Sequence, residues 1–318
     1  MFLKAAATGR TPKANHVESE KIIGILRETG PLTGWQLLEK SGLEALPLWQ
    51  SCRQTPEIHC ECAGKRYLRL DRNVEGYARL SPSIRREFLT YTVLGLKEQT
   101  VEIAAMAQRL SQDVEQISRA KYNLARDSMV SIVESLPVWK SIEESVCFII
   151  AGDVTYGMAH AVPRPEISTG KMVRGSDLDI VVIAEDEVPK AALKDLDQAI
   201  YRKKHYLLVH PNYHEEIDYL VKDISKVRRQ LAFDSFQHMI ASKIINEGEW
   251  LCGSSGVFRK IKAMVEEARV PEKIVAMESQ AAEDRKRAEI SLLQADASTA
   301  NAPFLNLFYT SEEGDEIY

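Results

Sequence analysis

The sequence predicts an α+β protein with more than one domain, and three observations support this. Its 318 residues exceed the usual size of one domain. Apolar residues recur at helical spacing over much of residues 17–54 and 81–136. Two continuous apolar runs, 146–151 and 180–184, are short enough to be buried strands. With 45% hydrophobic and 27% charged residues, the chain has a globular composition, which argues against a disordered, collagen-like or membrane protein.

The sequence also bears on the cellular compartment. The apolar runs are far too short to cross a bilayer, and the first ten residues contain no apolar run of signal-peptide length. The five cysteines are an odd number and are scattered along the chain, which is typical of a reducing compartment. We therefore expect a cytoplasmic protein with no membrane contact.

Residues 17–72 predict three short helices followed by a β-hairpin. The first helix covers 17–28 and ends at Gly30-Pro31. The second, Gly34–Lys40, is opened by Thr33 and Gln36 in a capping-box pattern. The third covers 46–54 and ends before a proline. The segments Ile58–Cys62 and Arg66–Asp71 then alternate as strands about an Ala63-Gly64 turn.

This order of elements resembles the winged helix-turn-helix family, to which we assign residues 17–80. In that family the third helix enters the major groove and the hairpin contacts the DNA backbone. The resemblance implies contacts to DNA or RNA from Gln50 and Arg53 on the helix, and from Lys65, Arg66 and Arg69 on the wing. Residues 1–80 carry a net charge of +3, whereas the remainder carries −8. The alternative is a winged helix that contacts protein.

The next segment, 81–124, predicts a helical connector. Ser81-Pro82 suits a helix start, and breaks are expected at Gly95 and at residues 111–113. Its apolar stripe is interpreted as core. At the other end of the chain, residues 266–318 predict a C-terminal helix and an acidic tail, which contains Glu312, Glu313, Asp315 and Glu316.

Three aspartates lie on the apolar strands of residues 146–221. The strand Val146–Ala151 ends in Gly152, and the next strand begins with Asp177 and Asp179, which alternation places on one face. A third strand within 215–221 contains Asp218. Neighbouring carboxylates stay ionised at neutral pH only if a cation compensates them, and a divalent metal does this best.

These strands resemble the nucleotidyltransferase superfamily, the DNA polymerase β-like fold. The matching motifs are IIAG ending at Gly152, GSDLDIVVIAED at 175–186 and EEIDYLV at 215–221, and the resemblance covers about residues 125–265. It implies a mixed β-sheet flanked by helices and a two-metal mechanism with Mg²⁺ or Mn²⁺. Asp177 and Asp179 would hold metals that bridge the triphosphate of an NTP such as ATP. Asp218 would hold the metal nearer the attacking hydroxyl.

The nucleotide-binding residues implied by the resemblance are Gly152, Asp153, Thr155, Lys171, Arg174 and Ser176. Two departures stand out. Asp153 replaces the usual Ser or Gly phosphate donor, so Thr155 or Tyr156 is the candidate hydroxyl. The 24 residues between Gly152 and Asp177 also exceed the family's usual spacing. Lys171 and Arg174 in this segment either bind phosphate or are solvated.

The resulting hypothesis is a Mg²⁺-dependent enzyme that transfers a nucleoside monophosphate from an NTP to a hydroxyl. The acceptor is left open among nucleic acid, protein and small molecule, as are the base preference and the oligomeric state. The alternative is a DNA-binding regulator whose degenerate nucleotidyltransferase domain only senses nucleotide.

Overall fold

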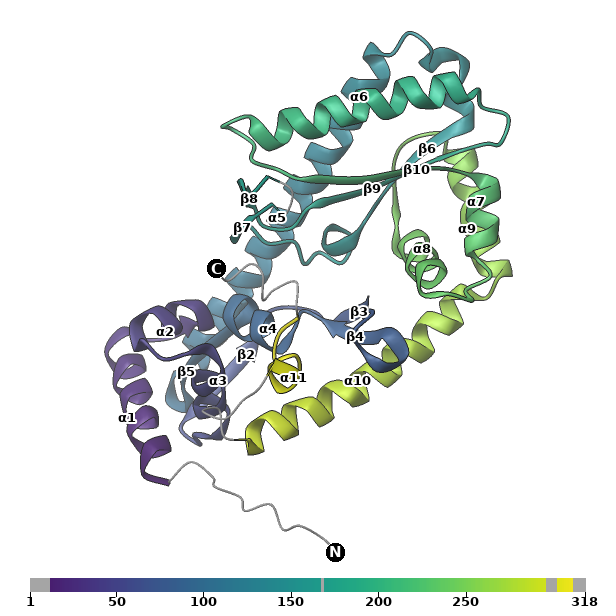
Figure 1. Cartoon of the computed structure of the whole chain (residues 1–318). Coiled ribbons are helices and arrows are strands. Elements are labelled where there is room, and N and C mark those ends of the chain that lie inside the picture. The colour runs from purple at the N-terminus through teal and green to yellow at the C-terminus, as the bar shows by residue number, and fades with distance from the viewer. Residues whose placement is uncertain (1–11, 167–168, 296–301, 311–318) are drawn as a thin grey trace, which may run out of the picture. The chain divides into compact units, whose positions relative to one another are not determined.

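The computed structural model describes residues 12–166, 169–295 and 302–310, and its architecture combines helices with several small sheets (Figure 1). The expected acidic tail lies outside these residues. The chain divides into a first unit of 1–69, 79–112 and 279–318, and a second unit of 70–78 and 113–278. This division differs from the four consecutive segments expected from the sequence, because the C-terminal segment returns to the first unit.

Helices surround a three-stranded antiparallel sheet of order β1-β5-β2 in the first unit. Thr33 caps α2 through the predicted capping box with Gln36. Leu26, Leu37 and Leu94 are among the fully buried core side chains. The elements are α1 (Pro12–Thr29), β1 (Leu32–Thr33), α2 (Gly34–Ser41), α3 (Ala45–Gln54), β2 (Ile58–Cys62), α4 (Ile84–Tyr91), β5 (Thr92–Leu96) and α11 (Ala302–Leu305).

The prediction of a hairpin about Ala63-Gly64 is wrong. β2 pairs with β5, with Ile58 opposite Leu96 and Cys62 opposite Thr92. The other expected strand, β3 (Tyr67–Leu70), pairs with β4 (Ala78–Ser81). β5 is buried at all five positions and therefore supplies an apolar partner that a local turn signal does not reveal.

The expected helical connector is also corrected. Ser81 belongs to β4, and α4 begins after Ser83, whose hydroxyl accepts from the Arg86 amide. Gly95 lies in strand β5. The helix α5 (Thr100–Ser135) continues through residues 111–113, because these three polar residues are all exposed and disturb no packing. The unit boundaries at 112/113 and 278/279 fall within α5 and α10 (Val270–Gln294).

The second unit contains a four-stranded mixed sheet of order β10-β9-β6-β11. β10 runs parallel to β9, whereas β6 is antiparallel to both β9 and β11. Figure 1 shows α6 along one face of the sheet and α7, α8 and α9 on the other. The elements are β6 (Val146–Ala151), β7 (Pro163–Pro165), β8 (Met172–Arg174), β9 (Leu178–Ala184), α6 (Lys190–Val209), β10 (Ile217–Asp223), α7 (Ile224–Gln230), α8 (Phe236–Glu247), β11 (Glu249–Gly253) and α9 (Ser255–Glu267).

Both faces of this sheet are buried at its centre, which accounts for the uninterrupted apolar runs of β6 and β9. Phe148, Ile180 and Val182 belong to one core with residues of α5 and α6. At the other side of β6, Leu251 and Cys252 are buried in β11.

Candidate active site

Two of the three predicted aspartates are direct neighbours on adjacent strands, and the third, Asp177, immediately precedes β9. Asp179 is the second residue of β9 and lies in register with Asp218, the second residue of the parallel strand β10. Directly paired residues of neighbouring strands point to the same face, and alternation adds Asp177 and Glu216 to it. Asp218 is exposed, as is Leu220 two residues further along this face. The acidic edge is therefore open to solvent on the β10 side.

Gly152 is required beside Asp179. Its φ is +71°, and a Cβ built on it would lie 2.0 Å from Asp179 Oδ2. Ala151, the last residue of β6, is the register partner of Asp179. The turn that ends β6 thus leaves space for the Asp179 carboxylate only because residue 152 has no side chain.

Arg164 on β7 links the two acidic strands. Its side chain is 14% exposed, and its guanidinium donates to Glu216 Oε2 at 2.9 Å and to the Gly175 carbonyl at 2.9 Å. Asp177 Oδ2 lies 3.9 Å from the same group. Burial raises the pKa of Glu216, while Arg164 acts in the opposite direction. The sequence did not indicate that Arg164 is the ion-pair partner of Glu216 and Asp177, because it is distant from both residues along the chain.

A second buried cation supports the start of β10. Lys121 on α5 donates to Glu215 Oε2 at 2.5 Å and to the Arg174 carbonyl at 2.7 Å. Burial raises the pKa of Glu215, and Lys121 opposes that shift. The ion pair holds β8 and the approach to β10 against α5, which fixes the strand on which Asp218 lies.

The carboxylates fit a divalent cation only in part. Within the described ranges, no three His, Cys, Asp or Glu side chains are grouped so that they could hold a metal ion. Mg²⁺, however, usually takes one or two carboxylates and completes its shell with water and substrate phosphates. Asp179 and Asp218, which are directly paired on β9 and β10, would supply these two carboxylates, and the exposed Asp218 leaves room for water and phosphates.

The hydroxyl groups near Gly152 are engaged with the protein. Ser176 donates to Asp153 Oδ2 at 2.8 Å and accepts from the His160 amide at 3.2 Å. The Thr155 hydroxyl donates to the Gly152 carbonyl at 2.8 Å within the short turn Gly152–Val154. Asp153 is therefore stabilised by Ser176, and Thr155 closes the turn.

The long segment between Gly152 and Asp177 contains the short two-stranded sheet of β7 and β8. Lys171, just before β8, and Arg174, at its end, are both exposed. Arg174 also donates its backbone amide to the His214 carbonyl at 2.8 Å. The structure thus places Arg174 beside the entry to β10, where the acidic edge begins.

The sequence named Tyr156 as a candidate hydroxyl near Gly152 but did not indicate its partners. The Tyr156 hydroxyl donates to Glu247 Oε2 at 2.5 Å, and Lys243 on α8 pairs with the same carboxylate. Burial, followed by Glu247, raises the pKa of Tyr156. Lys243 and Glu247 are spaced i,i+4 on a helix, which is the signal that could have revealed the pair.

The expected nucleic-acid contacts in the first unit lie in different surroundings. The Gln50 amide is buried and donates to the Leu292 carbonyl at 2.6 Å and the Ala295 carbonyl at 2.9 Å. Arg66 pairs with Glu87 at 2.6 Å and Glu289 at 3.0 Å. Gln50 therefore caps the end of α10, and its contact with nucleic acid stays a prediction.

The remaining three candidates in this unit are Arg53, Lys65 and Arg69. Arg53 and Lys65 are exposed, whereas Arg69 is half-buried in β3. Because β3 is not the strand that pairs with β2, Lys65, Arg66 and Arg69 do not form the expected two-stranded wing with it.

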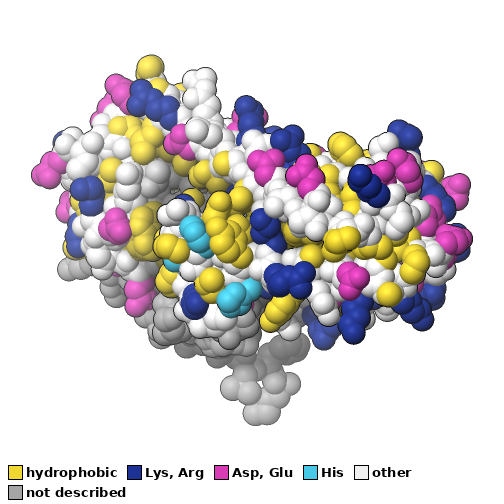
Figure 2. Space-filling view, turned by 90° about the horizontal axis from the view of Figure 1, so that it is seen from above, with side chains coloured by type: hydrophobic (Ala, Val, Ile, Leu, Met, Phe, Trp, Pro, Cys, Tyr) yellow, Lys and Arg dark blue, Asp and Glu magenta, His cyan; other side chains and the backbone are white. Residues whose placement is uncertain are grey.

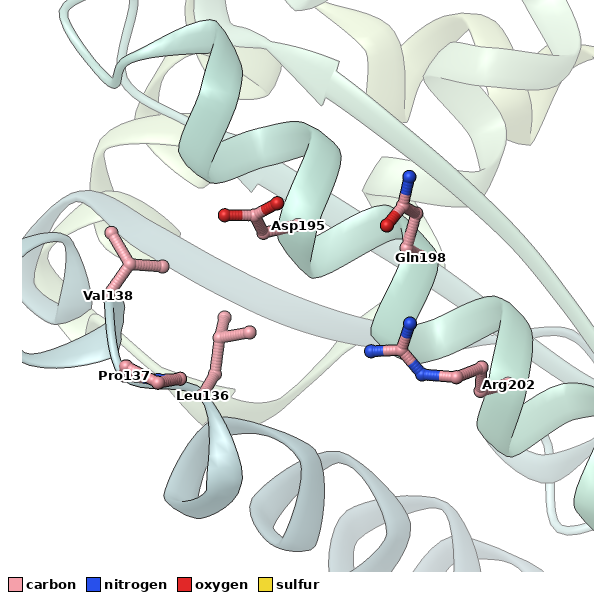
Figure 3. Close-up of a pocket in the computed structure, with 6 residues that line it drawn as sticks. All are labelled: Leu136, Pro137, Val138, Asp195, Gln198 and Arg202. Carbon is pink, nitrogen blue, oxygen red and sulfur yellow. The ribbon is translucent and has the colours of Figure 1, made fainter.

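A cavity of about 240 Å³ lies between α6 and the end of α5 (Figure 3). Its lining is Leu136, Pro137, Val138, Asp195, Gln198 and Arg202. None of these residues belongs to the acidic edge. Three of the six lining residues are polar, but they are not the predicted aspartates, so we do not place the chemistry in this cavity.

No protein-family model, curated protein or solved structure matches the chain. In the part of the chain that the structure describes, none of the helices has the length and apolar character needed to span a bilayer. The geometry of the acidic edge therefore carries the functional argument.

Proposed function

We propose that the protein is a Mg²⁺- or Mn²⁺-dependent nucleotidyltransferase that moves a nucleoside monophosphate from an NTP to a hydroxyl. The observation that carries this proposal is the registered pair Asp179 and Asp218, with the bare backbone of Gly152 against the Asp179 carboxylate. A strand, a glycine turn and two acidic strands in this arrangement support the nucleotidyltransferase fold that the motifs resemble.

Each residue of the edge has a part in this proposal. Asp177, Asp179 and Asp218 are the candidate metal ligands, and the bound cation would neutralise charge on the triphosphate and on the attacking oxygen. Gly152 leaves room for Asp179. Arg164 and Lys121 hold the strands that carry the carboxylates. Lys171 and Arg174, both exposed, are the candidate phosphate contacts.

For the first unit we propose a winged-helix-like domain in which β5 takes the place of the expected second wing strand. The order β1-β5-β2 beside α1, α2 and α3 supports this. Because Gln50 and Arg66 bond within the unit, we propose that α3 serves protein packing more than base reading. Arg53 remains the exposed candidate for a nucleic-acid contact.

A nucleotide-sensing regulator without transfer activity is the second candidate. The observation that favours it is the position of Arg164, whose guanidinium lies 3.9 Å from the Asp177 carboxylate. This positive charge neutralises part of the negative charge that would attract a second metal ion. The two candidates make opposite predictions about pyrophosphate release.

The proposal is tested by incubating the full chain with each labelled NTP and Mg²⁺, and by measuring pyrophosphate release and label transfer. Asp179→Asn keeps the size of the side chain and removes one metal-binding charge. We expect it to abolish transfer while the melting temperature in chelator is unchanged or higher, because repulsion among the carboxylates is relieved.

Asp127→Asn is the matched control, because Asp127 on α5 has a 69% exposed side chain. It should leave both transfer and melting temperature unchanged. A destabilised Asp179→Asn variant with near-normal specific activity would overturn the catalytic assignment.

A further inference from the structure

The C-terminal half of α6 and the loop that follows it have an unusual composition for this acidic chain. From Gln198 to His214 the sequence contains no Asp or Glu, but it contains Arg202, Lys203 and Lys204, three tyrosines and three histidines. On the face seen in Figure 2, histidine side chains lie beside Lys, Arg and hydrophobic side chains. The local charge is thus positive on a protein whose net charge is −5.

Aromatic rings are exposed on this surface. Tyr201 is 62% exposed and Tyr206 is 45% exposed, although aromatic side chains more often pack into cores. Their positions on α6, together with exposed Arg202, His205 and Val209, form one continuous helical face. We call these five residues the α6 face.

Aromatic rings pack together at the C-terminal end of the α6 face. The rings of Tyr206, His210 and Tyr213 pack on one another with centroid separations of 4.9, 5.2 and 5.9 Å. Lys203 Nζ lies 5.8 Å from the centre of the Tyr206 ring. An aromatic ring flanked by cations is the arrangement on which bases of a single strand stack while the phosphates meet Lys and Arg.

The C-terminal end of the α6 face adjoins the loop that leads into β10. His214 accepts from the Arg174 amide, and Glu215 donates its amide to the Leu207 carbonyl at 3.1 Å. Asp218 follows His214 by four residues. A strand lying along the α6 face would therefore end near the loop that enters β10. The Asp218 side chain lies on the opposite face of the sheet, since its neighbour Tyr219 faces α6 and donates to the Asp197 carbonyl at 3.2 Å.

We propose that the α6 face, with the adjacent Lys203, binds single-stranded nucleic acid by base stacking on Tyr201 and Tyr206 and phosphate contacts to Arg202 and Lys203. A duplex keeps its bases stacked inside and offers only phosphates, so it gains nothing from the two rings.

The test is fluorescence anisotropy of a labelled uridine 20-mer with the full chain, in chelator and without NTP, across a range of salt concentrations. We expect binding that weakens with salt. The variant Arg202→Gln/Lys203→Gln should reduce the slope of log affinity against log salt by about 1.4, which corresponds to two phosphate contacts on a single strand. Tyr201→Leu and Tyr206→Leu should each lower affinity about tenfold with little change of slope.

The control Lys190→Gln/Lys194→Gln removes the same charge from exposed positions at the other end of α6 and should change neither quantity. Melting temperatures of all variants should match the wild type, since the altered side chains are largely on the surface. No binding at low salt, equal losses in the control, or equal competition by polyglutamate would overturn the proposal. The last result would instead indicate an acidic protein partner.

This experiment fails independently of the transfer assay. Asp179→Asn should bind the 20-mer with wild-type affinity in chelator, whereas α6 variants should retain NTP binding. Loss of strand binding on Asp179→Asn alone would also contradict the assignment to the α6 face.

Discussion

Two glycines that follow β6 allow the effect of backbone strain to be distinguished from the effect of crowding at the acidic edge. Gly152 and Gly157 have φ values of +71° and +66°, but only a Cβ at 152 meets another atom, namely Asp179 Oδ2. Alanine at either position should destabilise the fold by about 1 kcal/mol, because left-handed backbone is unfavourable for residues with a Cβ. At position 152 the added methyl group must also displace the carboxylate.

We therefore predict that Gly152→Ala abolishes Mg²⁺-dependent NTP binding, while Gly157→Ala retains it despite a similar loss of stability. Titration calorimetry and urea unfolding of both variants measure the two effects. Equal NTP affinity in the two variants would show that the close approach of Gly152 to Asp179 has no part in binding.

Lys222 is a buried cation at the far end of β10. It is 6% exposed and donates to Gln230 Oε1 at 3.0 Å, and among the described residues no carboxylate pairs with it. Burial, followed by the nearby charge of Lys226, lowers the pKa of Lys222 from 10.5 to about 8. The native state therefore binds fewer protons than the unfolded state between these two pH values, and the free energy of unfolding should rise across this window.

Lys222→Met should raise the free energy of unfolding at pH 7 by on the order of 2–3 kcal/mol, because it removes a charge that burial penalises. The gain should be full below pH 8 and should disappear as pH approaches 10.5. Urea unfolding at pH 7 and at pH 10 measures it, with Lys190→Met as the exposed control. A gain that is independent of pH would contradict the proposed cause.

At the scale of elements, Arg164 ties β7 to β10 and to the start of β9. Its partner Glu216 has a side chain that is 15% exposed, and burial raises the pKa of that carboxyl. Removing the cation leaves a largely buried carboxylate without its partner, which is strongly destabilising.

Arg164→Met should lower the free energy of unfolding at pH 7 by about 2 kcal/mol. Without Arg164 the pKa of Glu216 rises further above its value in the unfolded chain. Glu216 is therefore protonated in the folded state as the pH falls towards 5, and part of the lost stability should be regained. The double variant Arg164→Met/Glu216→Gln should be more stable than the single variant and less sensitive to pH. Urea unfolding at both pH values provides the measurement, and additive effects of the two changes would argue against the link.

Two residues of helix α3 distinguish a role in packing from a role in DNA recognition. Gln50 is bonded to two carbonyls at the end of α10, whereas Arg53, one turn away, is exposed. Gln50→Ala should cost about 2 kcal/mol, because it leaves buried acceptors unsatisfied. Arg53→Ala should change stability by less than about 0.5 kcal/mol. Denaturant unfolding compares them, and an undisturbed Gln50→Ala variant with weakened duplex binding would restore Gln50 as a base reader.

Local patterns predicted elements better than they predicted pairing. The capping box of Thr33 and the apolar run of β6 are visible in the sequence and form as expected. The pairing of β2 with β5 depends on residues about 35 positions apart, and β5 reads equally well as part of a helix when its burial is unknown.

For the molecule as a whole, the sequence predicted an α+β chain and an acidic edge, but not how the chain is divided. The C-terminal part of α10 belongs to the first unit, where Leu292 is fully buried and Arg285 donates to the Pro82 carbonyl. Nothing in the spacing of residues 266–294 indicates which distant strands they meet. For the same reason Arg164 and Lys121 were not recognised as partners of the β10 carboxylates.

The central claim, that the acidic edge binds an NTP together with a divalent metal, is tested most directly by calorimetry of the full chain with each NTP. We predict that affinity rises at least tenfold when Mg²⁺ is added, and that Asp179→Asn loses this rise while Asp127→Asn keeps it. NTP affinity that is equal in Mg²⁺ and in excess chelator, for the wild type and both variants, would contradict the account.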